Sequence, residues 1–192
     1  IEEGQTISQP YIVALMVEAL PLQGGETVLE IGTGSGYAAA VIAKIAQHVY
    51  TIERYSQLAV KAAATLAVEG FDNVNALHGD GTLGWPEHAP FDAIVVAAGG
   101  PRVPESLKHQ LRIGGRMVIP VGSRDRRTQE LLRITRVAEE EFQTEELLDV
   151  RFVPLVGEEG WTPDRPDDQP APLAPVRPPP LDDAPLARSI AL

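Results

Sequence analysis

Hydrophobic positions in the first half of the chain predict strands that alternate with helices. Residues 27–31 (TVLEI) are mostly apolar and run straight into glycines, which indicates a buried strand. Residues 48–53 alternate weakly between polar and apolar positions and predict a second strand, residues 74–78 predict a third, and residues 91–98 carry the strongest strand signal. Residues 55–69 and the stretch after Gly36 are rich in alanine and lack helix breakers, which favours helices. This alternation predicts an α/β fold with a doubly wound, mostly parallel sheet that is Rossmann-like.

The pattern changes on either side of this region. Residues 11–20 carry apolar side chains at helical spacing and predict an amphipathic helix ahead of the first strand. Residues 104–111 predict a short helix, after which Gly114 and Gly115 turn into a strand at 116–121. Two later apolar segments, 130–137 and 147–153, are separated by an acidic connection at 139–146. They predict an antiparallel pair at the edge of the sheet.

Composition divides the chain into two parts. Residues 1–161 have the apolar content of a folded domain, and the first residue is Ile1, which suggests that an upstream segment of the domain is missing. Nine of the last 32 residues are proline, so we interpret 162–192 as an extended linker or disordered tail. Such a tail either tethers a further domain or is a simple unstructured terminus.

Charge and residue usage exclude several classes of protein. The net charge of −11 argues against nucleic acid as a partner, since a phosphate-binding surface would be basic. No apolar run reaches the roughly 18 residues of a membrane span, so we expect no membrane partner. The absence of cysteine excludes disulfides and thiolate chemistry and is compatible with a cytoplasmic protein. The four histidines have no metal-like spacing, so no metal site is predicted.

Three glycines follow the first strand and form the candidate ligand site. Gly32, Gly34 and Gly36 allow backbone angles closed to other residues and let a ligand lie against bare main chain. A dinucleotide fingerprint needs its third glycine at position 37, where this chain has Tyr37. The spacing instead suits a nucleoside with an amino-acid tail and no phosphates. The alternative is a tight turn that binds nothing.

Acidic residues follow the next two predicted strands. Glu53 ends the second strand, where a carboxylate can accept hydrogen bonds from both hydroxyls of a ribose. Asp80 and Gly81 close the third strand, where Asp80 could bind an exocyclic amine and Gly81 could admit a base. Each also has an ordinary interpretation, as a solvated acid or an Asp-Gly turn. In an open α/β sheet, ligands bind at the carboxyl ends of the strands, so the three features together favour one site.

Several segments resemble a known family. VLEIGTGSGY, TIER, HGDG, FDAIVVAA and LRIGGRMVIPVG are similar to motifs of class I S-adenosylmethionine-dependent methyltransferases. GQTISQP near the start and VRFVPLVG near the end resemble the protein-L-isoaspartate (D-aspartate) O-methyltransferase family more narrowly. The resemblance runs from about Gly4 to Trp161.

The resemblance implies a repair reaction on damaged proteins. In that family a methyl group passes from S-adenosyl-L-methionine to the free α-carboxylate of an isoaspartyl residue in a protein or peptide. The ester then collapses to a succinimide, which reopens partly to normal aspartate. Ser8 matches the active-site serine, and Val153, Pro154 and Leu155 match the segment that contacts the substrate backbone. The cofactor positions implied in this way are Gln5, Thr6, Ile7, Gly32, Gly34, Gly36, Glu53, Asp80 and Gly81.

Elementary chemistry agrees with a carboxylate acceptor. A carboxylate is ionised at neutral pH, so no general base is required and catalysis can rest on positioning. The Ser8 hydroxyl could hold it with one hydrogen bond, and Ser8 also suits a helix N-cap. Three other functions stay open: methylation of another small molecule or protein, including nucleobase or amine substrates, a nicotinamide-dependent oxidoreductase, and a non-catalytic cofactor-binding module.

Overall fold

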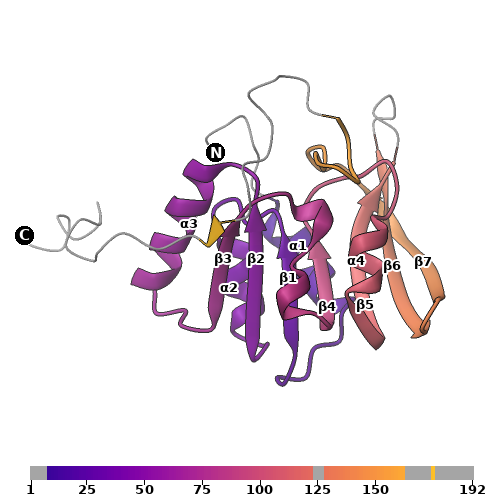
Figure 1. Ribbon diagram of the computed structural model, residues 1–192, viewed down its shortest axis with the longest axis horizontal. Helices are drawn as coiled ribbons and strands as arrows, with labels where there is room; N and C mark the ends of the chain where they lie inside the picture. The colour runs from indigo at the N-terminus through magenta and orange to yellow at the C-terminus, as the bar shows by residue number, and fades with distance from the viewer. Residues whose placement is uncertain (1–7, 123–127, 163–173, 176–192) are drawn as a thin grey trace, which may run out of the picture.

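An eight-stranded sheet forms the centre of the computed structural model, which describes residues 8–122, 128–162 and 174–175. The strand order is β7-β6-β5-β4-β1-β2-β3-β8, with β7 and β3 toward opposite ends in Figure 1. The strands are β1 (Thr27–Ile31), β2 (His48–Glu53), β3 (Val74–His78), β4 (Phe91–Val96), β5 (Leu111–Val121), β6 (Gln129–Ala138), β7 (Glu141–Val150) and β8 (Ala174–Pro175).

The first five strands are parallel to one another, as the alternating pattern predicts. β1 lies between β2 and β4, β3 pairs with β2, and β5 pairs with β4, all in parallel. The chain therefore winds outward from β1 in both directions, which makes the end of β1 a topological switch point. β6 and β7 add an antiparallel pair at one edge, which confirms the predicted mixed sheet.

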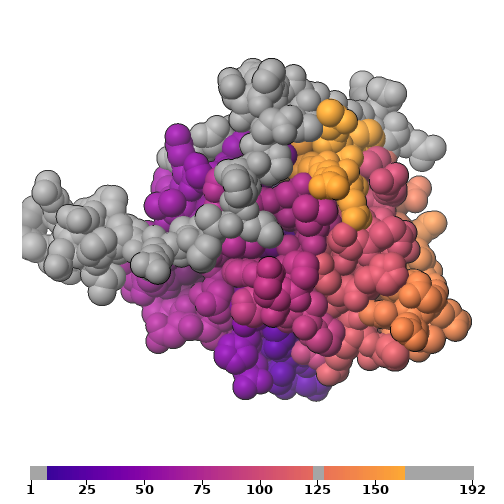
Figure 2. Space-filling view, in the orientation of Figure 1, coloured from indigo at the N-terminus to yellow at the C-terminus, as the bar shows by residue number. Residues whose placement is uncertain are grey.

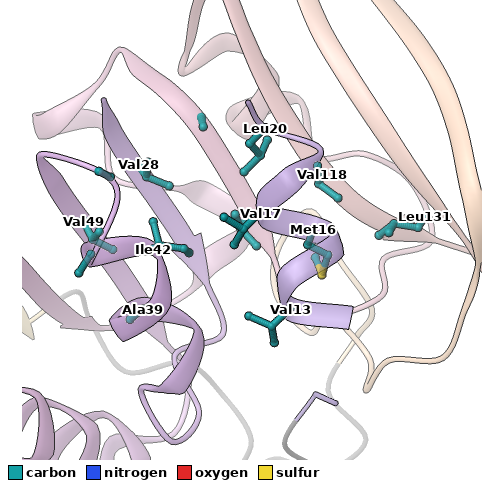
Figure 3. Close-up of a cluster of buried hydrophobic side chains, with 14 of the residues drawn as sticks. Val13, Met16, Val17, Leu20, Val28, Ala39, Ile42, Val49, Val118 and Leu131 are labelled. Carbon is teal, nitrogen blue, oxygen red and sulfur yellow. The ribbon is translucent and has the colours of Figure 1, made fainter. Parts of the chain in front are cut away.

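Helices bury both faces of this sheet. They are α1 (Pro10–Glu18), α2 (Tyr37–Ala43), α3 (Ser56–Val68) and α4 (Glu105–His109), with short 3-10 turns η2 (Gly81–Leu83) and η3 (Pro86–His88). On one face, Val13, Met16 and Val17 of α1 join Ile42 of α2 against the sheet, as Figure 3 shows. On the other face, Leu107 of α4 is fully buried in a second apolar cluster. Burial on both sides explains why β1 and β4 are nearly continuous apolar runs.

The structure corrects the prediction of a turn at Gly114 and Gly115. Both glycines lie within β5, which begins at Leu111. Phe91 of β4 pairs with Leu111 while Ala93 pairs with Arg116, so β5 carries extra residues at this point. Gly114 has a φ of 85°, a conformation open to glycine, and it absorbs the extra length as a bulge.

The acidic connection predicted at 139–146 is also wrong. β7 begins at Glu141, so only residues 139 and 140 join β6 to β7. Several side chains of residues 141–146 are exposed, and β7 is an edge strand whose only neighbouring strand among the described residues is β6. A charged strand at the open edge of a sheet also blocks pairing with other chains. β7 then ends at Val150, three residues before the predicted end at Val153.

Most of the proline-rich segment lies outside the described residues. Its exception is β8, which pairs antiparallel with β3 through Ala174 and Pro175. The division into a domain at 1–161 and a tail at 162–192 stays a prediction. No helix within residues 8–122, 128–162 and 174–175 is long and apolar enough to cross a bilayer.

Candidate functional site

The candidate site forms where the carboxyl ends of β1, β2 and β4 meet. Ile31 is in register with Ile52 of β2 and Val96 of β4. The backbone ladder continues past the strands, since Gly32 N–H donates to the Ile52 carbonyl and Ala97 N–H to that of Ile31, each at 2.8 Å. The first residues after three strands are thereby held side by side at one sheet edge.

A pocket at this edge gathers most of the predicted site residues that the structure describes. Its lining includes Ser8, Gly32, Gly34, Glu53, Gly81, Val153, Pro154 and Leu155. These residues come from both ends of the chain as well as from the strand ends. Gly36 and Asp80 lie outside the lining, and Gln5, Thr6 and Ile7 lie outside the described residues.

The glycine turn adopts the backbone conformation that its spacing predicts. Gly32, Gly34 and Gly36 have φ values of 95°, 54° and 84°, which residues with a Cβ rarely adopt. Gly36 is the N-cap of α2, and a Cβ there would meet Leu66 of α3 at 3.3 Å. Gly32 and Gly34 therefore face the ligand space, whereas Gly36 lets two helices approach each other.

Glu53 is held rigidly at the end of β2. Its Oε2 accepts the Gly34 N–H at 2.8 Å and its Oε1 accepts the Tyr55 N–H at 2.9 Å. The residue is only 5% exposed, yet it lines the pocket. Each carboxylate oxygen keeps a further lone pair, so Glu53 can still accept hydrogen bonds from a diol. The glycine turn and this acid therefore form one preorganised unit.

Asp80 has a more structural position than Glu53. Its Oδ1 accepts from the backbone and hydroxyl of Thr82 at 2.9 and 2.7 Å, and its Oδ2 accepts the Glu158 N–H at 2.8 Å. Asp80 thereby caps η2 and holds a distant loop. Next to it, Gly81 lines the pocket, and a Cβ there would lie 2.4 Å from Cγ2 of Ile31. The close contact between residue 81 and Ile31 therefore requires glycine at position 81.

Beneath the turn lies a buried polar chain that the sequence analysis did not assign. Glu30 is fully buried, its Oε2 accepts the Thr51 hydroxyl at 2.5 Å, and Thr51 in turn contacts the Thr33 hydroxyl at 2.6 Å. Burial raises the pKa of Glu30 from 4.5 to about 8, and the neighbouring Glu53 carboxylate adds to the rise. Glu30 is therefore mostly protonated at neutral pH and supports the turn while adding little charge.

We expect Glu30 to make the protein less stable as the pH rises. Between pH 4.5 and about 8 the folded protein keeps a proton on Glu30 that the unfolded chain has lost. Stability should fall across this window by up to ~1.4 kcal/mol per pH unit and level off above it. Denaturant unfolding of wild type and Glu30→Gln from pH 5 to 9 measures this effect. The variant should lack that slope, and parallel curves for the two proteins would contradict the assignment.

Ser8 lines the pocket and does not cap α1. The N-cap of α1 is Gln9, and no side chain caps the helix. Pro10 occupies the first turn and has no N–H, and the Gln9 carbonyl accepts from the Ile12 and Val13 N–H groups. The helix thus begins without the Ser8 hydroxyl, and the predicted capping role of Ser8 is wrong. Its side chain is half-buried at the pocket wall.

Val153, Pro154 and Leu155 form an extended segment beside Gly99, which follows β4. Gly99 N–H donates to the Val153 carbonyl at 2.8 Å, and Leu155 N–H donates to the Gly99 carbonyl at 2.9 Å. Arg54, which follows Glu53, donates from Nη1 to the Val156 carbonyl at 3.2 Å. The segment therefore closes one wall of the pocket. Val156 also lines the pocket, and further lining residues that the sequence analysis did not assign are Val13, Ile31, Thr33, Ser35, Tyr37, Ala38, Ile52, Arg54, Tyr55, Ala97 and Ala98.

Most of these additional residues adjoin the motifs that the sequence analysis used. Arg54 and Tyr55 directly follow Glu53, and Thr33 and Ser35 lie between the three glycines. These lining residues could therefore have been predicted from their position next to a motif. Val13 had no such signal, because its place in the apolar pattern of α1 indicates only core.

Comparison with known proteins gives a consistent result. Residues 1–160 match the sequence model of the family described as protein-L-isoaspartate(D-aspartate) O-methyltransferase (PCMT). Protein-L-isoaspartate O-methyltransferase 1 of Rhodopseudomonas palustris is 62% identical over 174 residues, which cover 89% of this chain and 71% of the relative.

Solved structures agree with the sequence relatives. A protein-L-isoaspartate O-methyltransferase superposes with a TM-score of 0.77 at 34% identity, over 83% of this chain and 51% of that one. A Plasmodium falciparum protein assigned to the same family, in complex with S-adenosyl-L-homocysteine, has a TM-score of 0.67 at 28% identity. That match covers 80% of this chain and 77% of the other.

Proposed function

The chain belongs to the protein-L-isoaspartate (D-aspartate) O-methyltransferase family, and we propose that it methylates isoaspartyl residues. The methyl group of S-adenosyl-L-methionine goes to the α-carboxylate of L-isoaspartyl and D-aspartyl residues in damaged proteins. One observation carries the proposal. Ser8 and the segment from Val153 to Leu155, the two parts that resemble the substrate site, line the same pocket as the glycine turn and Glu53.

The residues of the pocket fit S-adenosylmethionine. Gly32 and Gly34 offer bare backbone in left-handed conformations to the amino-acid part of the molecule. Glu53 has accepting capacity left for the ribose hydroxyls, and Gly81, which lines the pocket, presents backbone without a side chain to the base. Asp80 lies outside the pocket lining, and beside its three protein hydrogen bonds its Oδ2 keeps one lone pair for the exocyclic amine. Roles for Gln5, Thr6 and Ile7 stay predictions, since these residues lie outside the described ranges.

The protein contributes position and exclusion of water more than acid or base chemistry. When bound, S-adenosylmethionine supplies a methyl group on an electrophilic sulfonium. The acceptor carboxylate is ionised at neutral pH and needs no deprotonation. The Ser8 hydroxyl donates one hydrogen bond that orients the acceptor carboxylate. Because the hydroxyl is neutral, this bond does not strongly reduce the nucleophilicity of the carboxylate. Holding two reactants in line is the main source of rate in such a reaction.

The segment from Val153 to Leu155 suits recognition of a peptide backbone. Gly99 occupies one side of the segment through two backbone hydrogen bonds. A substrate strand therefore pairs with the other side, where the exposed Pro154 has a carbonyl that accepts but no N–H that donates. Backbone pairing recognises an extended peptide with little demand on its side chains. That breadth suits an enzyme that acts on many damaged proteins.

Methyl transfer to two matched peptides tests the proposal. We expect wild-type protein to label a peptide with one L-isoaspartyl residue and to leave the same peptide with normal aspartate unlabelled. Transfer of radioactive methyl groups measures this directly. Equal labelling would favour a methyltransferase with another substrate, and binding of S-adenosylhomocysteine without labelling would favour a non-catalytic module. Binding of NAD in its place would favour an oxidoreductase.

Ser8→Ala is the second arm of that experiment. The variant should lower kcat/KM for the isoaspartyl peptide roughly tenfold, the value of one lost hydrogen bond to a charged group. Its affinity for S-adenosylhomocysteine should stay the same. An unchanged kcat/KM would remove Ser8 from the proposed site. The cytoplasmic location, the absence of nucleic-acid and membrane partners, and a further domain on the tail stay predictions from sequence.

A further inference from the structure

Residues 153–161 form a closed loop, here named the latch loop, which is coloured orange to gold along the upper edge of Figure 2. Trp161 N–H donates to the Leu155 carbonyl at 2.8 Å, and Gly157 N–H donates to the Trp161 carbonyl at 3.1 Å. The Trp161 indole N–H also donates to the Gly99 carbonyl at 2.9 Å. Residues 153–156 of the loop line the pocket. A shift of residues 157–161 therefore moves the pocket wall that faces the substrate.

The latch loop is fastened to the cofactor side of the pocket through Asp80 and Thr82. The Glu158 N–H donates to Asp80 Oδ2 at 2.8 Å, and the Glu159 N–H donates to the Thr82 hydroxyl at 3.1 Å. The fit is close, since a Cβ on Gly157 would lie 2.1 Å from Asp80 Oδ1. The acid proposed to bind the base therefore also holds the loop that carries the substrate wall.

A second fastening joins the loop to α4. The Glu159 carboxylate accepts from the Ser106 hydroxyl at 2.5 Å and from the Ser106 N–H at 3.1 Å. Both atoms of this pair are partly buried, and the acceptor is charged, so the contact is stronger than a neutral surface hydrogen bond. Among the described residues, Ser106 is the hydrogen-bond partner of the Glu159 side chain. The neighbouring Glu158 has an exposed side chain and anchors the loop by its backbone alone.

We propose that Glu159 is a positioning residue for the peptide substrate. By fixing the latch loop to Ser106, it sets the position of residues 153–156 against the pocket. Because the loop is also tied to Asp80, filling the cofactor site tightens the substrate wall, and the two ligands bind cooperatively. This inference rests on the proposed function and adds a residue that contacts neither ligand.

Steady-state kinetics with an isoaspartyl peptide tests the positioning role. Glu159→Gln should raise KM for the peptide roughly five- to twentyfold, with kcat at saturation changed less than about twofold. The affinity for S-adenosylhomocysteine without peptide should stay within about twofold. Glu158→Gln is the matched control and should behave as wild type. Ser106→Ala should reproduce the Glu159→Gln effect, and Ser106→Thr, which keeps the hydroxyl, should largely restore the wild-type KM.

Hydrogen exchange gives a readout that needs no methyl transfer. S-adenosylhomocysteine should slow amide exchange of residues 153–161 in the wild type and in Glu158→Gln, and this slowing should be lost in Glu159→Gln. A variant that lowers the melting temperature but keeps the peptide KM and the ligand-induced slowing would overturn the inference. Failure of the proposed function has a different signature, because the wild type itself would then not label the isoaspartyl peptide.

Discussion

Glu53→Ala should lose binding of S-adenosylhomocysteine by a factor of about 100 or more. The variant removes a nearly buried carboxylate that can accept hydrogen bonds from two ribose hydroxyls, and each such bond to a charged acceptor is worth ~1.5–3 kcal/mol. It also frees the Gly34 and Tyr55 N–H groups, which Glu53 now holds. The glycine turn then loses the group that fixes it. Calorimetric titration measures the loss.

Two further variants separate ligand contact from support of the turn. Glu53→Gln keeps one carbonyl oxygen as acceptor and should fall between wild type and Glu53→Ala. Glu18→Ala removes an exposed acid from α1 and should leave the affinity unchanged. If Glu53→Ala bound S-adenosylhomocysteine within threefold of the wild type, Glu53 would not be a ribose acceptor.

Gly81→Ala should damage stability and cofactor binding together. The added Cβ would lie 2.4 Å from Cγ2 of Ile31, a β-branched residue in a strand with little freedom to move. Overpacking of this kind costs ~1–3 kcal/mol, which lowers the melting temperature of a chain of this size by about 2–12 °C. Because Ile31 and Gly81 both line the pocket, the affinity for S-adenosylhomocysteine should fall at least tenfold. Thermal unfolding and calorimetry measure the two effects.

Gly25→Ala is the matched control for that variant. Gly25 precedes β1, and a Cβ there would meet nothing within 4 Å. The same chemical change should therefore leave the melting temperature and the affinity close to wild type. Equal effects of the two substitutions would mean that the close contact between Gly81 and Ile31 is not what requires glycine.

Local pattern was sufficient for the central sheet. Short strand-like runs predict β1 to β4 within two residues, and the signal is clearest in β1 and β4, whose residues are nearly all buried. The hydrophobic pattern failed for the exposed strand β7 and for the irregular start of β5. The acids of β7 read as a connection because an edge strand tolerates charge on an exposed face, and the bulge in β5 read as a turn because both need glycine.

The sequence by itself therefore determined the cofactor corner, since Gly32, Gly34 and Glu53 lie at strand ends that a parallel sheet brings to one edge. By resemblance the sequence also predicted that Ser8 and residues 153–155 bind the substrate. It did not predict that these two segments line one pocket. Tertiary structure alone decided that Ser8 faces the pocket and leaves α1 uncapped by its hydroxyl. It decided as well that the latch loop returns to Asp80. Contacts between residues so far apart in the chain depend on strand order and register, and no local spacing encodes either of these.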